Sequence, residues 1–113
     1  MTNTIEYNQF LDVDIRIGTI IEAQVNTSLK KKSIILQIDF GNEIGIKKSS
    51  AQLQENYKCI DLINKQIAGV VNFPPKQIGN LISEVLVLGF PNEKNDPILI
   101  SPDLLIKNGM RLY

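Results

Sequence analysis

The chain has 113 residues, of which 12 are basic and 12 are acidic, so its formal net charge is zero. This length allows one domain with a single modest core, and we expect residues 1–113 to form one unit. Dedicated nucleic-acid-binding proteins usually carry a basic excess, which this composition lacks. However, eight lysines lie between residues 30 and 76 against four acidic residues. They either form one basic face or are scattered over a soluble surface.

The sequence shows no sign of export or membrane insertion. Cys59 is the only cysteine, so no internal disulfide can form, although small secreted domains are often bridged. The first seven residues lack the basic and apolar regions of a signal peptide. No apolar run approaches the roughly 20 residues of a membrane span. We therefore expect a cytoplasmic protein.

Alternating hydrophobicity predicts a protein built mostly of strands. From Val13 to Val25 every odd position is apolar or small, which predicts one long strand with its odd-numbered side chains buried. Gly18 would lie on the opposite face, where a glycine often marks a bulge or bend. Residues 34–40 and 44–46 alternate in the same way, and Gly41-Asn42 between them predicts a tight hairpin.

The rest of the chain supplies one helix and further strands. Residues 49–56 are the best helix candidate, with Ser49 as cap and Gln52 completing a capping box. The other predicted features are a connection at 26–32, a strand at 67–73, a turn at Gly79-Asn80, a strand buried on both sides at 85–88, a polar loop at 91–97, and a last hairpin pairing 98–100 with 110–113. Five core strands with a helix between the third and fourth match the all-β, five-stranded OB-fold barrel.

The residue types give little support to catalysis. There is no histidine, so the commonest general base and metal ligand is missing, and one cysteine cannot hold structural zinc. We expect no metal, no cofactor and no enzyme. Three catalytic alternatives are each weaker than a structural explanation. They are a Ser-Lys nucleophile from Ser49 or Ser50 with Lys47 or Lys48, a reactive thiol at Cys59, and paired carboxylates at Asp12 and Asp14.

Two segments favour binding instead. In Asn72-Phe73-Pro74-Pro75-Lys76 the two prolines fix the backbone and remove two N–H donors, so the segment is rigid. Phe73 could then line an apolar groove, although a place in the core is at least as plausible. In Lys47-Lys48-Ser49-Ser50 two lysines precede the predicted helix, which suggests an anion site, the alternative being a solvated loop.

Several motifs together resemble one family. They are Asp14-Ile15-Arg16-Ile17-Gly18-Thr19-Ile20, residues 44–52 (IGIKKSSAQ), residues 62–66 (LINKQ), residues 71–76 (VNFPPK), residues 83–89 (SEVLVLG), and Pro102-Asp103 before Asn108-Gly109. The chain is similar to the CsaA family of secretion-related chaperones from about Phe10 onward. The opening motif alone is shared with the wider tRNA-binding-domain family.

The resemblance implies an OB-fold homodimer that binds unfolded or precursor polypeptides during export, with export machinery as a further partner. The expected peptide-binding residues are Phe73, Pro74, Pro75, Leu86, Lys47, Lys48 and Lys76. The alternative function is a structure-specific tRNA-binding module, since Ser83 matches a serine in the tRNA-contacting loop of that family. Its expected RNA-binding residues are Lys47, Lys48, Ser49, Ser50, Asn72, Lys76 and Ser83.

Both ends of the chain are apolar although they lie outside the five predicted core strands. The apolar side chains are Ile5, Tyr7, Phe10 and Leu11 at one end and Leu104, Leu105, Ile106, Met110, Leu112 and Tyr113 at the other. A two-fold interface would bury them, so we expect these extensions to form a homodimer.

Overall fold

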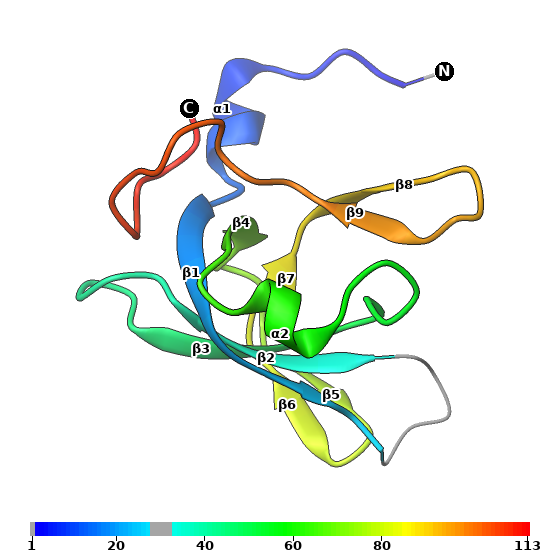
Figure 1. Cartoon of the computed structure of the whole chain (residues 1–113). Coiled ribbons are helices and arrows are strands. Elements are labelled where there is room, and N and C mark those ends of the chain that lie inside the picture. The colour runs from blue at the N-terminus through cyan, green and yellow to red at the C-terminus, as the bar shows by residue number, and fades with distance from the viewer. Residues whose placement is uncertain (1, 28–32) are drawn as a thin grey trace.

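The computed structural model describes residues 2–27 and 33–113, so part of the expected connection at 26–32 and its three lysines lie outside the described residues. Figure 1 shows a barrel of strands with a short helix on an arm at the N-terminal end. The helices are α1 (Tyr7–Leu11) and α2 (Cys59–Leu62). The strands are β1 (Ile15–Val25), β2 (Ile34–Asp39), β3 (Ile46–Ala51), β4 (Gln66–Val70), β5 (Lys76–Ile78), β6 (Leu81–Ser83), β7 (Leu86–Val87), β8 (Gly89–Pro91) and β9 (Pro97–Leu99).

Five strands form the barrel in the order β3-β2-β1-β4-β7, all antiparallel to their neighbours. The two end strands, β3 and β7, also contact each other and nearly close the barrel. The helix α2 lies between the third and fourth barrel strands in the chain. This is the expected OB-fold, and the all-β prediction is confirmed.

The core lies inside the barrel and is aliphatic around one aromatic ring. Along β2 the even-numbered residues Ile34, Leu36 and Ile38 are at most 1% exposed, and Phe40 follows them at 0%. Leu62 of α2 closes one end of the same cluster. These residues alternate with half-buried ones, so the period of two in the sequence predicted this strand correctly.

The long strand β1 was predicted with the wrong face inward over its first half. Gly18 and Ile20 are buried there, not their odd-numbered neighbours. A register shift between Ile20 and Glu22 inserts one extra residue, after which Ala23 faces Leu36 of the core. The sequence pattern ran unbroken through the bulge because the other face of β1 is apolar too.

The helix predicted at residues 49–56 is wrong. Residues 46–51 form β3, in which Ser49 pairs with Leu36 of β2 and is 1% exposed. The Ser49 hydroxyl donates to the Val85 carbonyl at 3.0 Å, so it closes the barrel and caps no helix. The capping-box pattern was misleading because a serine and a glutamine at this spacing also occur here in and after a strand. In this strand the serine points inward and bonds a carbonyl across the barrel.

The predicted turns fared better than the predicted strand ends. Gly41 and Gly45 have φ of +89° and +88° in the connection from β2 to β3, so the hairpin is confirmed with a longer loop. The turn at Gly79-Asn80 joins β5 to β6 as expected. The strand predicted at 67–73 ends at Val70.

The last two strand predictions are corrected. The strand at 85–88 is not buried on both sides, because β7 spans two residues and Leu86 is 49% exposed. The final hairpin pairs β9 with β8, not with residues 110–113. Those residues run along β1 instead, with the Leu112 N–H donating to the Ile15 carbonyl at 2.8 Å. The last residues of the chain therefore bond to the distant strand β1 and not to β9, which is the strand nearest to them in sequence.

The C-terminal segment, residues 106–112, is held by the buried side chain of Gln66. Its amide donates to the Ile106 carbonyl at 2.6 Å and accepts from the Ile106 N–H at 3.1 Å. Asn108 adds a hydrogen bond with Thr19 at 2.7 Å. Within the described residues, no helix is both long and apolar enough to cross a membrane.

Candidate binding site

A cavity of about 310 Å³, here called the proline groove, opens between the β5–β6 hairpin and the start of β7. Four of the expected peptide-binding residues line it, namely Phe73, Pro74, Lys76 and Leu86. The other lining residues are Ser50, Ile78, Ser83, Glu84 and Val85. The structure therefore brings together side chains from three separate segments of the chain, and Pro75, Lys47 and Lys48 are not part of this lining.

Phe73 belongs to the rim of this groove and not to the core. Its side chain is 49% exposed, so the alternative of a buried strand-end phenylalanine is wrong. Phe73 lies after the end of β4, where Pro74 and Pro75 prevent the strand from continuing. Because proline fixes φ, the rim is ordered before any ligand arrives. Such a rim suits apolar side chains of many shapes.

The floor of the groove is fixed by the closing segment, residues 83–85, which is bonded along β3. The Glu84 N–H donates to the Lys48 carbonyl at 2.8 Å, and the Lys48 N–H donates to Glu84 Oε1 at 3.0 Å. The Ser50 N–H donates to Ser83 Oγ at 3.1 Å. A backbone bond and side-chain bonds thus together join the closing segment to β3.

The two buried serines of the expected RNA-binding set are used inside the chain. Ser83 is 8% exposed, and its hydroxyl accepts from Ser50 N–H and donates to the Val85 carbonyl at 3.4 Å. Ser49 donates to the same carbonyl. Both hydroxyls therefore help to close the barrel, and of the two serines only Ser83 lines the groove, together with Ser50.

The three described lysines of the expected sets, Lys47, Lys48 and Lys76, do not all face the same side. Successive residues of a strand point to opposite faces, and Lys47 pairs with the buried Ile38, so it lies on the inward face of β3 and is half-buried. Lys48 is exposed on the outer face. Lys76 is exposed at the start of β5 and lines the proline groove. Lys48 and Lys76 are therefore the described lysines of the expected set that are best placed to meet a ligand.

Asn72 connects the N-terminal arm to the barrel. Its side-chain amide donates to the Asp12 carbonyl at 2.7 Å and accepts from the Asp14 N–H at 2.9 Å. The Val71 N–H also donates to the Asp14 carbonyl at 2.9 Å. The expected RNA contact at Asn72 therefore competes with a structural role, which sequence spacing of 58 to 60 residues could not reveal.

The catalytic alternatives find no completed site. Asp14 is paired with Arg16 at 2.6 Å and with Arg111 at 3.4 Å, so its partner is arginine and not Asp12. Hydrogen bonding to Asp14 raises the pKa of Arg16 above its ordinary value. Cys59 is half-buried and packs against the core. Among the described residues no group of three metal-ligating side chains comes together.

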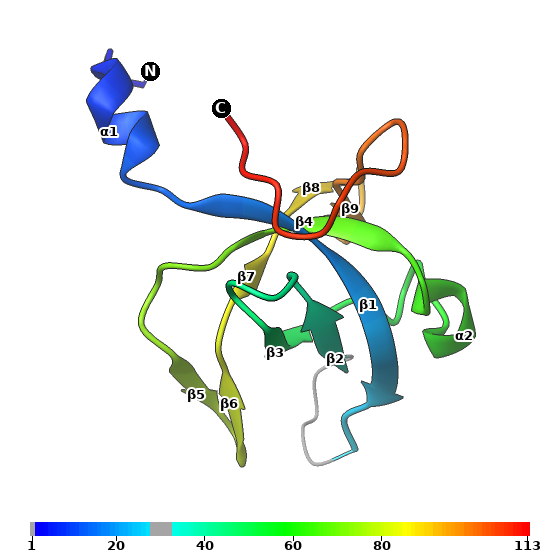
Figure 2. The ribbon, with the colours of Figure 1, turned by 90° about the vertical axis from the view of Figure 1, so that its left-hand side faces the viewer.

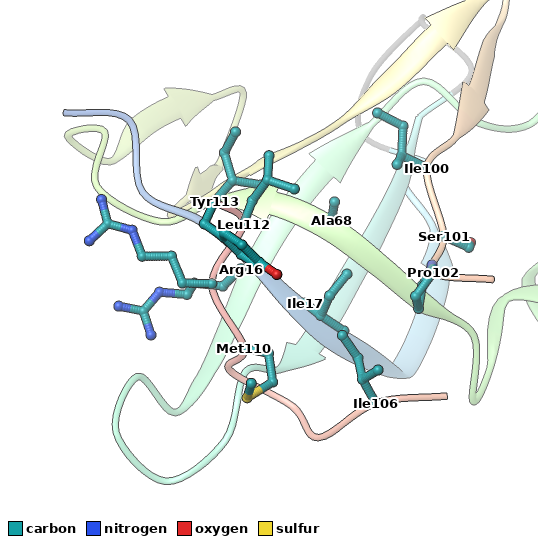
Figure 3. A pocket seen from close by; sticks show the side chains of 12 residues that line it. Arg16, Ile17, Ala68, Ile100, Ser101, Pro102, Ile106, Met110, Leu112 and Tyr113 are labelled. Carbon is teal, nitrogen blue, oxygen red and sulfur yellow. The ribbon is translucent and has the colours of Figure 1, made fainter. Parts of the chain in front are cut away.

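A second cavity of about 350 Å³, here called the terminal groove, lies between β1, β4 and the C-terminal segment. Figure 3 shows Ile17, Ala68, Ile100 and Ile106 around it, with Met110 and Leu112 from the last residues. This explains why the odd-numbered face of β1 is apolar as well. In Figure 2, α1 stands off the barrel on one side of this end and the 101–109 loop on the other.

Comparison with known proteins identifies the family. The crystal structure of the chaperone CsaA from Bacillus anthracis str. Ames matches with a TM-score of 0.92 and 42% sequence identity, covering 98% of this chain and 100% of that one. The CsaA chaperone protein from Picrophilus torridus matches with a TM-score of 0.90 and 47% identity, covering 97% and 100%. The chain belongs to the CsaA family. The resemblance seen in its motifs is thus confirmed.

The chain also matches a broader domain family. The family model described as "Putative tRNA binding domain" matches residues 15–111 of this chain. The methionine–tRNA ligase of Methanococcoides burtonii is 33% identical over 99 residues, which is 88% of this chain but 14% of the ligase. The chain thus spans about one seventh of the length of the curated relatives that it matches, and corresponds to a non-catalytic domain of them.

Sequence reasoning missed three residues that shape the proline groove, Ile78, Glu84 and Val85. Glu84 and Val85 stand in the motif at 83–89, but nothing in their spacing shows that they lie against β3. The polar pair Ser83-Glu84 directly before an apolar run was the available signal. Polar side chains in such a place often replace backbone partners.

Proposed function

We propose that this chain is a homodimeric chaperone whose proline groove binds unfolded or precursor polypeptides in the cytoplasm before their export. The observation that carries the proposal is the cavity between Phe73, Pro74 and Leu86, which is apolar, open to solvent and rigid on one side. The 42% and 47% identity to two CsaA chaperone structures over their whole length supports it. Components of the export machinery are proposed as further partners.

The groove suits a ligand of variable sequence. Its apolar walls gain free energy from almost any bulky side chain, at about 1.5–3 kcal/mol for a fully buried one. Its two charged residues, Lys76 and Glu84, have opposite signs, so the groove excludes neither basic nor acidic segments by charge. A protein that must accept many clients needs this tolerance.

The homodimer is proposed from the unpartnered apolar ends. No residue of α1 is buried, and Tyr7 and Leu11 are 63% and 37% exposed. A five-residue helix is too short to be stable alone in water, so a surface that covers it is expected. The C-terminus, whose last residues line the terminal groove, lies at the same end of the molecule as this arm (Figure 2). Two-fold pairing would let the arm and groove of each copy cover those of the other.

A structure-specific tRNA-binding module is the second candidate. The family match over residues 15–111 supports it. The outer face of β3 carries Lys48, and Lys76 lies across the closing segment from it. Aromatic residues for stacking unpaired bases are scarce, with four Phe, three Tyr and no Trp. A tRNA ligand would then be held through its phosphates and its shape.

Salt dependence separates the two candidates. Binding of a fluorescently labelled, unfolded polypeptide and of a labelled tRNA would be measured by anisotropy at salt concentrations from about 50 mM to about 500 mM. Charge interactions are weakly screened at the lower concentration and strongly screened at the higher one. We expect polypeptide binding to survive at the highest salt, because it rests on apolar burial. Any tRNA binding should fall steeply, by roughly 0.7–0.9 in log K per unit log salt for each phosphate neutralised.

Two outcomes would contradict the proposal. Polypeptide binding that disappears in salt would move the site from the groove to the lysines. Tight tRNA binding together with no measurable polypeptide binding would make the second candidate the function.

A further inference from the structure

A third cavity of about 330 Å³, here called the seam cavity, lies where β3 and β7 meet as the barrel closes. It is lined by the end of β3 and the residues after it, by β7 and by β9. None of the described residues that line it carries a charge. Its walls are mainly aliphatic, with Leu53, Val87 and Leu99 among them.

The seam cavity adjoins the proline groove. Ser50 and Leu86 line both, so these two side chains form the divide between them. Leu86 is 49% exposed although it stands in a barrel strand, so about half of it is open to a ligand. An extended polypeptide that crosses Leu86 would lie over both cavities. Side chains on one face of such a chain repeat about every 6.8 Å, at two residues each.

The seam cavity is also rigid. Leu53 at its base is 1% exposed and belongs to the core. The Leu99 N–H donates to the Tyr57 hydroxyl at 3.0 Å, which holds β9 to the segment after β3. The Asn56 amide donates to the Pro97 carbonyl at 3.4 Å on the same side. A cavity that is already formed costs a ligand little ordering free energy.

We propose that the seam cavity is a second subsite for the polypeptide that the proline groove binds, and that it takes one bulky, uncharged side chain. This inference rests on the proposed polypeptide-binding function. The preferred ligand is an extended segment with two large apolar side chains on the same face, one for each cavity. The lining favours this occupant over a nucleic acid, because phosphates would find no cation among the described lining residues. An apolar side chain needs no cation and gains free energy when it leaves water.

The subsite would separate two functions that otherwise share a surface. Lys76 and Ser50 at the proline groove could serve a polypeptide or a tRNA. A change confined to the seam cavity should affect the polypeptide alone. The position for such a change is Gln52, which lines the cavity yet is exposed, so a larger side chain there can fill the cavity without displacing the core.

The experiment uses labelled Gly/Ser-based peptides with one leucine, or with two leucines separated by one, two or three residues. They are tested on the full chain and on Gln52→Trp. The matched control is Gln24→Trp, an exposed glutamine on β1 that lines neither cavity. A labelled tRNA is measured in parallel. Thermal melts establish that each variant is folded, and Gln52→Lys, which puts a charge at the cavity, replaces Gln52→Trp if the latter does not fold.

We expect one two-leucine spacing to bind the wild-type chain about tenfold more tightly than one leucine, which corresponds to about 1.4 kcal/mol. Gln52→Trp should remove this gain while leaving the one-leucine peptide and tRNA unchanged, and Gln24→Trp should keep it. If no spacing exceeds the one-leucine peptide, the second subsite is wrong although the proposed function stands. Loss of tRNA binding in Gln52→Trp would also overturn it. If no peptide binds the wild-type chain at all, the proposed function itself fails.

Discussion

Single residues in this chain are constrained by what lies directly against them. Phe73 and Phe90 show the contrast, since both are exposed, at 49% and 68%, but Phe73 lines the proline groove and Phe90 does not. Gly18 shows the opposite limit. A Cβ atom there would lie 2.6 Å from Ile38 Cγ2 and 2.8 Å from the Phe40 ring, so the barrel interior leaves room for glycine alone.

We expect Phe73→Ala to weaken binding of an unfolded polypeptide about tenfold, because the ring supplies a large part of the apolar wall. The measurement is anisotropy with a labelled unfolded polypeptide, after a thermal melt has shown that the variant folds. Phe90→Ala is the control, as it removes an exposed ring outside the groove. Equal losses in both variants would mean that binding follows overall surface hydrophobicity and not the proline groove.

Gly18→Ala should destabilise the fold by about 1–3 kcal/mol, the usual cost of adding a methyl group to a packed core. Denaturant unfolding would measure it. Gln24→Ala, an exposed change on the same strand, should cost little. A Gly18→Ala variant as stable as the wild type would mean that Ile38 and Phe40 can move aside at no cost.

Among the elements, two segments are attached to the barrel by side-chain hydrogen bonds in addition to backbone ones. Gln66 bonds both backbone groups of Ile106 and so holds the C-terminal segment. Glu84 and Ser83 bond the edge of β3 and so hold the closing segment. Loss of one of these polar residues therefore leaves specific backbone groups without partners, while the backbone hydrogen bonds of the same segment remain.

Replacing Gln66 with leucine, which has similar size but no amide, should loosen the C-terminal segment at Ile106, while its later residues stay bonded to β1. Two bonds to Ile106 disappear, at about 1–3 kcal/mol for each group left unsatisfied. Hydrogen exchange at the Ile106 amide should become much faster. Gln37→Leu, which removes a half-buried glutamine bonded to Glu22 where β2 pairs with β1, serves as control. Unchanged protection at Ile106 would show that the segment is held by its contacts with β1 alone.

Glu84→Ala should loosen the closing segment, because the Lys48 N–H loses its acceptor. Glu84→Gln keeps a side-chain carbonyl oxygen at the same place, so it should still accept the hydrogen bond from the Lys48 N–H and hold the closing segment. Hydrogen exchange at Lys48 would separate them, fast in the alanine variant and slow in the glutamine variant. If both variants exchange quickly, the charge of Glu84 and not its hydrogen bond is what matters.

The whole molecule has two ends of different character. One end carries α1, the last residues and the 101–109 loop, with Leu104 and Leu105 at 74% and 85% exposed. The β5–β6 hairpin projects from the opposite end, as Figure 2 shows. An assembly through the apolar end would leave both copies of the proline groove accessible.

At micromolar concentration, light scattering should give twice the chain mass. The double variant Tyr7→Ser with Leu105→Ser removes apolar surface from both sides of the terminal groove and should shift the protein toward a monomer. Ile60→Ser, which is 80% exposed on α2, is the control and should leave the dimer intact. A wild-type protein that stays monomeric at all concentrations would end the two-fold proposal.

Much of the fold followed from the sequence alone. The strand β2, its hairpin with β3 and the β5–β6 turn are local, so the period of two and the Gly-Asn turns predicted them. The rigid Phe73-Pro74-Pro75 segment also followed from the chain, because proline acts on its own backbone. The motifs further pointed to the right family, and with it to the barrel that those strands form.

Tertiary structure decided what depends on distant partners. Ser49 was read as a helix cap because its role lies in a bond to Val85, far along the chain. The predicted face of β1 is wrong over its first half because a bulge changes the phase and the C-terminal segment covers the other side. Lys47 and Lys48 are neighbours in sequence but lie on opposite faces of β3. The local sequence pattern shows which residues are apolar, whereas the closing of the barrel decides which apolar residues from distant segments come into contact. The cavities form only between such segments, so the sequence pattern could not locate them.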